Sequence, residues 1–194
     1  VELLNGPNGW EIPVRRSKIP GYDLRAWLRM PHAFHFSAGR GQTDFVLIPV
    51  HQKADYGRED YSGFRAAEAR ELTEALPRTI QKLRDQDFIV MGRLGQKHSE
   101  PSTRIFEQAG LSDANGEDQE AFLTVDREAR RVVPTLALIR AFVTSNQPEL
   151  GDTGFEVFDI DQLSEIGMNE EYYYSRVSDY LPCVLTVRVM ADDD

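Results

Sequence analysis

The side chains best suited to chemistry in this 194-residue chain come directly after short apolar runs. His51 follows the run at residues 44–50, and Arg93 follows the run at residues 88–92. Short runs rich in Val, Ile and Phe predict buried strands, so both side chains are expected at strand ends. Imidazole titrates near neutral pH and can donate a proton or bind phosphate. A guanidinium is permanently charged and only donates hydrogen bonds.

A further tract lies near the C-terminus, where the chain reads Val177-Ser178-Asp179-Tyr180-Leu181-Pro182. It resembles a Ser-Asp-His-x-Pro motif in which tyrosine has replaced histidine. Six more tracts occur in the order and at the spacing of one known family, at residues 29–36, 44–53, 65–69, 87–95, 106–113 and 158–163. Through these tracts most of the chain resembles the endonuclease/exonuclease/phosphatase family, also called deoxyribonuclease-I-like.

The resemblance implies an α/β fold, a sandwich of two mixed β-sheets flanked by helices, with the site at one edge of the strand ends. The length suits a single domain over residues 1–194. The family's first strands, which carry an Asn and a metal-binding Glu, are not recognisable upstream of Arg29. We therefore expect the N-terminal part of the fold to be lacking. The acidic tail at residues 190–194 is expected to be disordered.

The resemblance also implies a site in which three positions are substituted. The family's strand ends in Gly-Asp-x-Asn, whereas this chain reads Gly92-Arg93-Leu94-Gly95, and the motif's histidine is Tyr180. A guanidinium cannot orient or deprotonate water as a carboxylate does, and Gly95 has no side chain. A phenol with a pKa of about 10 is a poor substitute for imidazole. Because one general base contributes roughly 10²–10⁴-fold in rate, these changes predict an inactive site.

Three positions of the implied site are retained, namely His51, Asp161 and Asp179. By resemblance, His51 would contact the scissile phosphate, Asp161 would neighbour the metal and phosphate, and Asp179 would orient the missing histidine. The alternatives are a structural histidine at a strand end, an ordinary strand-end acid and an aspartate that caps a turn. We predict that Arg93 pairs with Asp161 or Asp179 in place of the metal. The alternative is that the Arg93 side chain points into solvent.

Two main classes of function remain open. The first is a catalytically inactive family member that acts as a binding or scaffold subunit and needs no cofactor. The second is a divergent Mg²⁺- or Mn²⁺-dependent phosphodiesterase, a nuclease or phosphatase, which would use His51 and Asp161 and bind the metal through Asp161. The substitutions favour the first. A third reading, another kind of α/β domain, applies if the motif matches are accidental.

Composition limits the partners. A formal net charge of −10 and a pI near 4.9 disfavour nucleic acid as a partner, because proteins that bind nucleic acid usually carry basic surfaces.

No apolar run approaches the roughly 18–20 residues that span a membrane, and no signal-peptide pattern is visible. A soluble protein without a membrane partner is therefore expected, cytoplasmic by default. The single cysteine, Cys183, excludes an internal disulfide. A lacking front segment would uncover a strand edge, which predicts a protein partner or self-association.

The coarse pattern alternates strands and helices. Strands are predicted at residues 44–50, 88–91 and 181–189, and a helix at residues 63–84 that Pro77 should kink or divide. The resemblance also implies a strand at residues 158–163, before the final motif. Residues 132–143 fit a strand or a helix. Tyr172-Tyr173-Tyr174 are expected to face core and surface alternately, or to anchor a protein partner or stack on bases.

Overall fold

The computed structural model describes the chain with short gaps. The described residues are 2–40, 43–53, 55, 60–94, 100–115, 120–126, 128, 131–136, 139–144, 154–158, 160–165, 167–178 and 180–187. The tail at residues 190–194 and most of the polar stretch 145–154 lie outside this set. Within the described part, no helix combines the length and the apolar character needed to cross a membrane.

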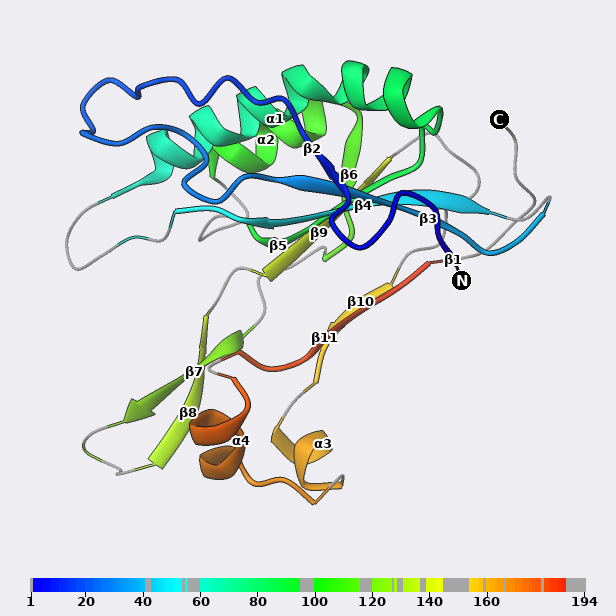
Figure 1. The fold of residues 1–194 in the computed structure, drawn as a ribbon. Coiled ribbons are helices and arrows are strands. Elements are labelled where there is room, and N and C mark those ends of the chain that lie inside the picture. The colour runs from blue at the N-terminus through cyan, green and yellow to red at the C-terminus, as the bar shows by residue number, and fades with distance from the viewer. Residues whose placement is uncertain are drawn as a thin grey trace.

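A seven-stranded mixed sheet forms the centre of the molecule (Figure 1). Its strand order is β1-β3-β4-β5-β9-β6, with β2 paired to β3 beside this path. Only β4 and β5 run parallel; the other pairs are antiparallel. The strands are β1 (Glu2–Leu3), β2 (Trp10–Glu11), β3 (His32–Ser37), β4 (Asp44–His51), β5 (Phe88–Arg93), β6 (Leu111–Asp113) and β9 (Ile139–Thr144).

Two helices, α1 (Ser62–Leu83) and α2 (Pro101–Gln108), cover one face of this sheet (Figure 1). Apolar residues recur on α1 at helical spacing, so Phe64, Leu72 and Leu76 face the main core together with Val46 and Ile48 of β4. The predicted helix is confirmed, but it is not divided. Pro77 lies inside one continuous 22-residue helix because packing against the sheet outweighs a single lost hydrogen bond.

A two-stranded antiparallel ribbon of β10 (Gly154–Val157) and β11 (Cys183–Thr186) lies on the other side of the sheet (Figure 1). Leu185 and Val187 pack there against Ile89 and Val143 of the central sheet. The predicted α/β architecture with two sheet layers and outer helices is thus confirmed, with this ribbon as a narrow second layer. The terminal strand is shorter than predicted, and it is not fully in the core, because Cys183, Val184 and Leu185 are half-buried and Thr186 is exposed.

A small lobe below the ribbon combines a β-hairpin with two short helices (Figure 1). Its elements are β7 (Glu120–Asp126), β8 (Arg131–Leu136), α3 (Ile160–Glu165) and α4 (Glu170–Arg176). Val132, Leu163, Tyr173 and Leu181 form its own apolar cluster. The lobe therefore folds around contacts that are separate from the main core.

The structure corrects one sequence-based prediction in this part of the chain, at residues 158–163, and resolves another, at residues 132–143. The strand expected at residues 158–163 is wrong, because Phe158 ends the ribbon and α3 begins at Ile160; the helix buries Leu163 in the lobe cluster. The ambiguous residues 132–143 form parts of two strands, β8 and β9. A helix there would have separated β9 from its partners on both sides in the sheet.

Candidate functional site

His51 and Arg93 lie side by side at one edge of the sheet. They are register partners at the ends of the parallel strands β4 and β5, and the Gln52 amide continues the ladder by donating to the Arg93 carbonyl at 2.9 Å. The His51 side chain is exposed. Carboxyl ends of parallel strands meet at the same edge, which is why two distant motifs converge here. The prediction that both residues occupy strand ends is confirmed.

Gly92 fixes how Arg93 leaves the strand. Its φ is +134°, and a Cβ built on it would lie 2.1 Å from the Val50 carbonyl oxygen. Any other residue would collide with the β4 backbone and strain its own. The glycine of this motif is therefore required for a close approach of two strands, whether or not the site performs chemistry.

Arg93 also contacts Tyr180. Its guanidinium carbon lies 5.7 Å from the centre of the half-buried Tyr180 ring. A cation over an aromatic face at this distance is attracted by about 0.5–2 kcal/mol, more when water is excluded. Arg93 and Tyr180, which come from separate tracts of the sequence, thus contact each other, and the alternative in which Arg93 simply points into solvent is not what the structure shows.

The other implied site residues are placed less fully. Asp161 lies in α3, and this helix is well separated from the ends of β4 and β5 in Figure 1. Its side chain, together with Gly95 and Asp179, falls outside the described residues. The pairing of Arg93 with Asp161 or Asp179 therefore stays a prediction, and so do the roles implied for these two acids.

A divalent cation is a poor fit to the described side chains at this edge. Mg²⁺ and Mn²⁺ prefer oxygen ligands, carboxylates above all. Arg93 is the register partner of His51 and contacts Tyr180, and its fixed positive charge repels a cation and offers no lone pair. Among the described residues, the edge holds an aromatic ring and a guanidinium where a metal-dependent site needs acids.

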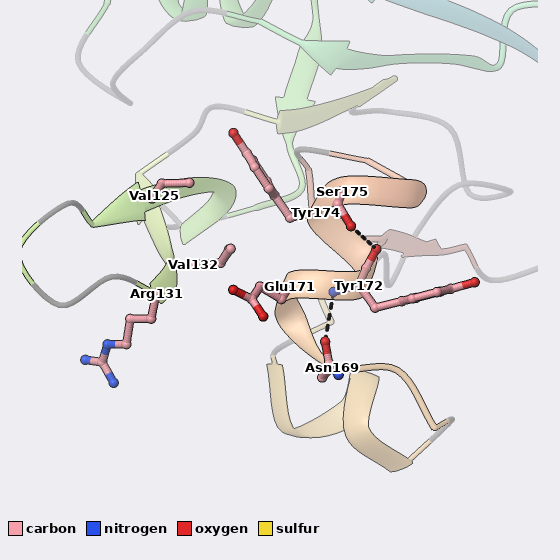
Figure 2. A pocket seen from close by; sticks show the side chains of 8 residues that line it. All are labelled: Val125, Arg131, Val132, Asn169, Glu171, Tyr172, Tyr174 and Ser175. Carbon is pink, nitrogen blue, oxygen red and sulfur yellow. Dashed lines mark hydrogen bonds between the residues drawn. The ribbon is translucent and has the colours of Figure 1, made fainter.

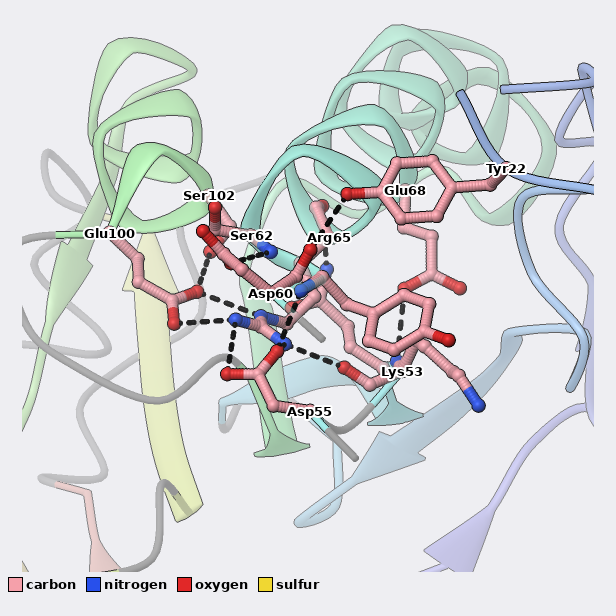
Figure 3. Close-up of polar contacts among 11 residues, drawn as sticks. Tyr22, Lys53, Asp55, Asp60, Ser62, Arg65, Glu68, Glu100 and Ser102 are labelled. Carbon is pink, nitrogen blue, oxygen red and sulfur yellow. Dashed lines mark hydrogen bonds and ion pairs between the residues drawn. The ribbon is translucent and has the colours of Figure 1, made fainter. Parts of the chain in front are cut away.

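A buried ion network beside this edge holds β4 to both helices (Figure 3). Arg65 of α1 is 1% exposed; it donates to both carboxylate oxygens of Glu100 at 2.8 Å, to Asp55 at 2.7 Å and to the Lys53 carbonyl at 2.9 Å. Burial alone would lower the pKa of Arg65, but its hydrogen bonds to Glu100 and Asp55 outweigh this and raise the pKa. The network joins the chain after β4 to the starts of α1 and α2.

Glu68, one turn after Arg65, secures the same segment from a second side. Its carboxylate accepts from the Trp27 amide at 3.0 Å and from the Lys53 amide at 3.3 Å. Burial raises the pKa of Glu68 to about 7, although those two amides and Arg65 oppose the shift. In the sequence, Arg65 and Glu68 are recognisable only as an Arg-x-x-Glu motif. Two charged residues on the apolar face of a predicted helix were the signal that could have identified a buried network.

The three tyrosines lie on α4, so they follow helical rather than strand geometry. Tyr173 is buried in the lobe cluster and Tyr172 is 55% exposed. Tyr172 and Tyr174 are among the residues that line a groove of about 520 Å³ between α4 and the β7–β8 hairpin, and in Figure 2 the Tyr172 ring points away from the hairpin. The residues that line this groove are Val125, Arg131, Val132, Asn169, Glu171, Tyr172, Tyr174 and Ser175.

Comparison with known proteins supports the fold and assigns no activity. No family model matches the chain, and no curated protein matches it. A functionally unknown conserved protein from Enterococcus faecalis is similar with a TM-score of 0.51 and 16% identity, over 91% of this chain and 60% of that one. At this identity the likeness concerns the fold alone.

Two further solved structures are similar at lower scores. The human nocturnin catalytic domain gives a TM-score of 0.45 at 14% identity, over 81% of this chain and 52% of that one. Sphingomyelinase C from Streptomyces griseocarneus gives 0.48 at 14% identity, over 67% and 47%. The chain thus spans between about half and three fifths of the length of the structures it resembles.

Glu68 should make folding stability depend on pH. Its pKa is raised in the folded protein, so its stabilising contribution is complete below about pH 4.5 and is lost as the pH rises through about 7. Between about pH 5.5 and 8, Glu68→Gln should therefore remove a decline of at most about 2 kcal/mol in the free energy of unfolding. Urea unfolding at several pH values measures this.

The exposed Glu74 of the same helix provides the control. Glu74→Gln should keep the pH profile of the original chain. If the profile of Glu68→Gln ran parallel to that of the original chain across the whole range, burial of Glu68 would not govern its titration.

Proposed function

We propose that this chain is a binding or scaffold protein built on a deoxyribonuclease-I-like fold whose phosphodiesterase site has lost its chemistry. The observation that carries the proposal is the contact between Arg93 and Tyr180 at the ends of the central strands. Each residue departs from its motif, and together they form an attractive pair. Such a pair stabilises the edge without needing a metal or a substrate.

The chemistry of the pair supports inactivity. Neither a guanidinium nor a phenol accepts a proton readily near neutral pH, so neither replaces a carboxylate or an imidazole. Where several groups act as a unit in catalysis, removing one of them abolishes most of the rate enhancement. His51 remains exposed next to Arg93, and a guanidinium only donates hydrogen bonds, so Arg93 cannot orient the imidazole for general-base catalysis as a carboxylate would.

The competing function is a divergent phosphodiesterase, a nuclease or phosphatase, that uses His51 and Asp161 with Mg²⁺ or Mn²⁺. The exposure of His51 at a strand end favours it, because a substrate phosphate could reach the ring. It requires Asp161 to supply a metal ligand from α3, a helix that lies away from that edge (Figure 1).

A hydrolysis assay separates the two functions. Single- and double-stranded DNA, RNA and a small phosphodiester are incubated with Mg²⁺ and with Mn²⁺. We expect no turnover by the original chain and measurable turnover by the triple variant Arg93→Asp, Gly95→Asn, Tyr180→His, since each restored group contributes about 10²–10⁴-fold. Arg93→Ala is the control, because it removes the cation–π contact without restoring an acid, and it should stay inactive.

One result would contradict the proposal. Metal-dependent turnover by the original chain that Asp161→Asn abolishes would make the protein a divergent phosphodiesterase. Circular dichroism of each variant shows whether it has folded, so that inactivity can be assigned to chemistry.

We further propose that the groove beside α4 contacts a protein, with a second copy of this chain as the occupant to test first. Tyr172 and Val125 are both exposed large side chains at its border, and tyrosine is enriched at the centres of protein interfaces. Arg131 and Glu171 place opposite charges on its two walls, which suits a contact between identical surfaces (Figure 2).

Sedimentation velocity over a range of concentrations tests self-association. We expect a concentration-dependent dimer that Tyr172→Ala weakens by about tenfold or more, whereas Tyr22→Ala, at a distant aromatic cluster, leaves it unchanged. A monomer at every concentration would contradict self-association through this groove.

A further inference from the structure

A second polar cluster lies at the opposite end of strands β4 and β5 from His51 and Arg93. The His35 Nε2 atom is 3.2 Å from Asp44 Oδ2 and 3.0 Å from Asp85 Oδ2. His35 is on β3, Asp44 begins β4, and Asp85 lies between α1 and β5. Asp85 is completely buried, and His35 is 9% exposed. Three elements of the main core thus bring one imidazole and two carboxylates together.

The backbone holds the Asp85 carboxylate and the strand position of His35 in place. The Asp87 amide donates to Asp85 Oδ1 at 2.7 Å, which turns the other carboxylate oxygen toward the imidazole. The His35 amide donates to Asn5 at 3.1 Å, and its carbonyl accepts from the Leu4 amide at 2.8 Å. In metal sites, ligating carboxylates are commonly held by a hydrogen bond of the kind that the Asp87 amide gives to Asp85.

A hydrogen bond alone does not account for the arrangement. One ring nitrogen carries at most one hydrogen, so it cannot donate linearly to two carboxylates at once. In a tetrahedral zinc site with ligand distances of about 2.0–2.1 Å, the ligand atoms are about 3.3–3.4 Å apart. The distances of 3.0 and 3.2 Å at the imidazole are close to that spacing, and all three ligand atoms lie within 4.8 Å of one another.

Charge also favours a cation. As metal ligands, two carboxylates and a neutral imidazole would sum to −2, a charge that one divalent cation neutralises. Asp44 Oδ1 is buried and has no hydrogen-bond partner among the described residues. The Asp44 side chain is 21% exposed, so the cluster is open on that side to a fourth ligand such as water.

We propose that His35, Asp44 and Asp85 bind one divalent transition-metal cation, with Zn²⁺ as the best match. An imidazole ligand favours zinc over magnesium, which prefers oxygen alone. The cation would join the β3–β4 hairpin to the connection between α1 and β5 and so stabilise the fold. This structural site is independent of the proposed function, because it lies at the other end of the strands from His51 and Arg93.

Zinc titration of the purified, chelator-treated chain tests this site. Isothermal titration calorimetry with ZnCl₂ should show one tight site, and the melting temperature should rise with zinc concentration. His35→Gln should weaken this binding by at least about 100-fold. His32→Gln should not, since His32 lies on the opposite face of the same strand and contacts only the Met30 carbonyl in the described contacts.

Cobalt provides a second readout that does not depend on stability. Co²⁺ should give the intense visible absorption of a four-coordinate ion with the original chain and with His32→Gln, but not with His35→Gln. Asp44→Asn, the change at the most exposed ligand, is the substitute if His35→Gln does not fold. Absence of zinc binding by the original chain, or equal binding by His35→Gln and His32→Gln, would overturn the proposal.

Discussion

The buried guanidinium of Arg65 is the interaction on which the candidate site edge depends. It bonds two carboxylates from separate segments and the Lys53 carbonyl, and so it fixes where the chain goes after His51. Removing one partner of such a buried network costs about 3–5 kcal/mol, because the remaining charges stay buried without compensation. Glu68 secures the same segment through the Lys53 and Trp27 amides. The edge is therefore held rigidly by groups that do not themselves face it.

This arrangement explains how a site can lose its chemistry without losing its shape. The network around Arg65 and the close approach at Gly92 belong to the fold, so they remain necessary when catalysis is no longer selected. Arg93 and Tyr180 attract each other at the ends of the central strands, and under the proposed function this attraction would take the place of the interactions that a metal and its acids provide. In this account the scaffold is preserved by stability, and the pair of substitutions is compatible with it.

Much of the fold was predictable from sequence because short apolar runs and family-like tracts mark its strands. Residues 44–50 and 88–91 were correctly predicted as β4 and β5, and this placed His51 and Arg93 at one edge. The strand predicted at residues 158–163 was wrong because the apolar spacing there fits both a strand and a helix: Phe158 and Ile160 are two residues apart, and Ile160 and Leu163 are three apart. Burial of Leu163 in the lobe cluster is what favours the helix. The contact of Arg93 with Tyr180 joins residues 87 positions apart, so no local pattern could indicate it. The cluster at His35 has the same origin, since Asp85 reaches it from a separate connection.

The central claim is that a cation–π pair stands where a metal-dependent site would need acids. A crystal structure of the chain grown with Mn²⁺, with anomalous scattering used to locate the metal, tests it most directly. The account predicts the Arg93 guanidinium over the Tyr180 ring and no manganese at the ends of β4 and β5. A manganese ion bound there by His51 or Asp161, with Arg93 turned away from Tyr180, would contradict it.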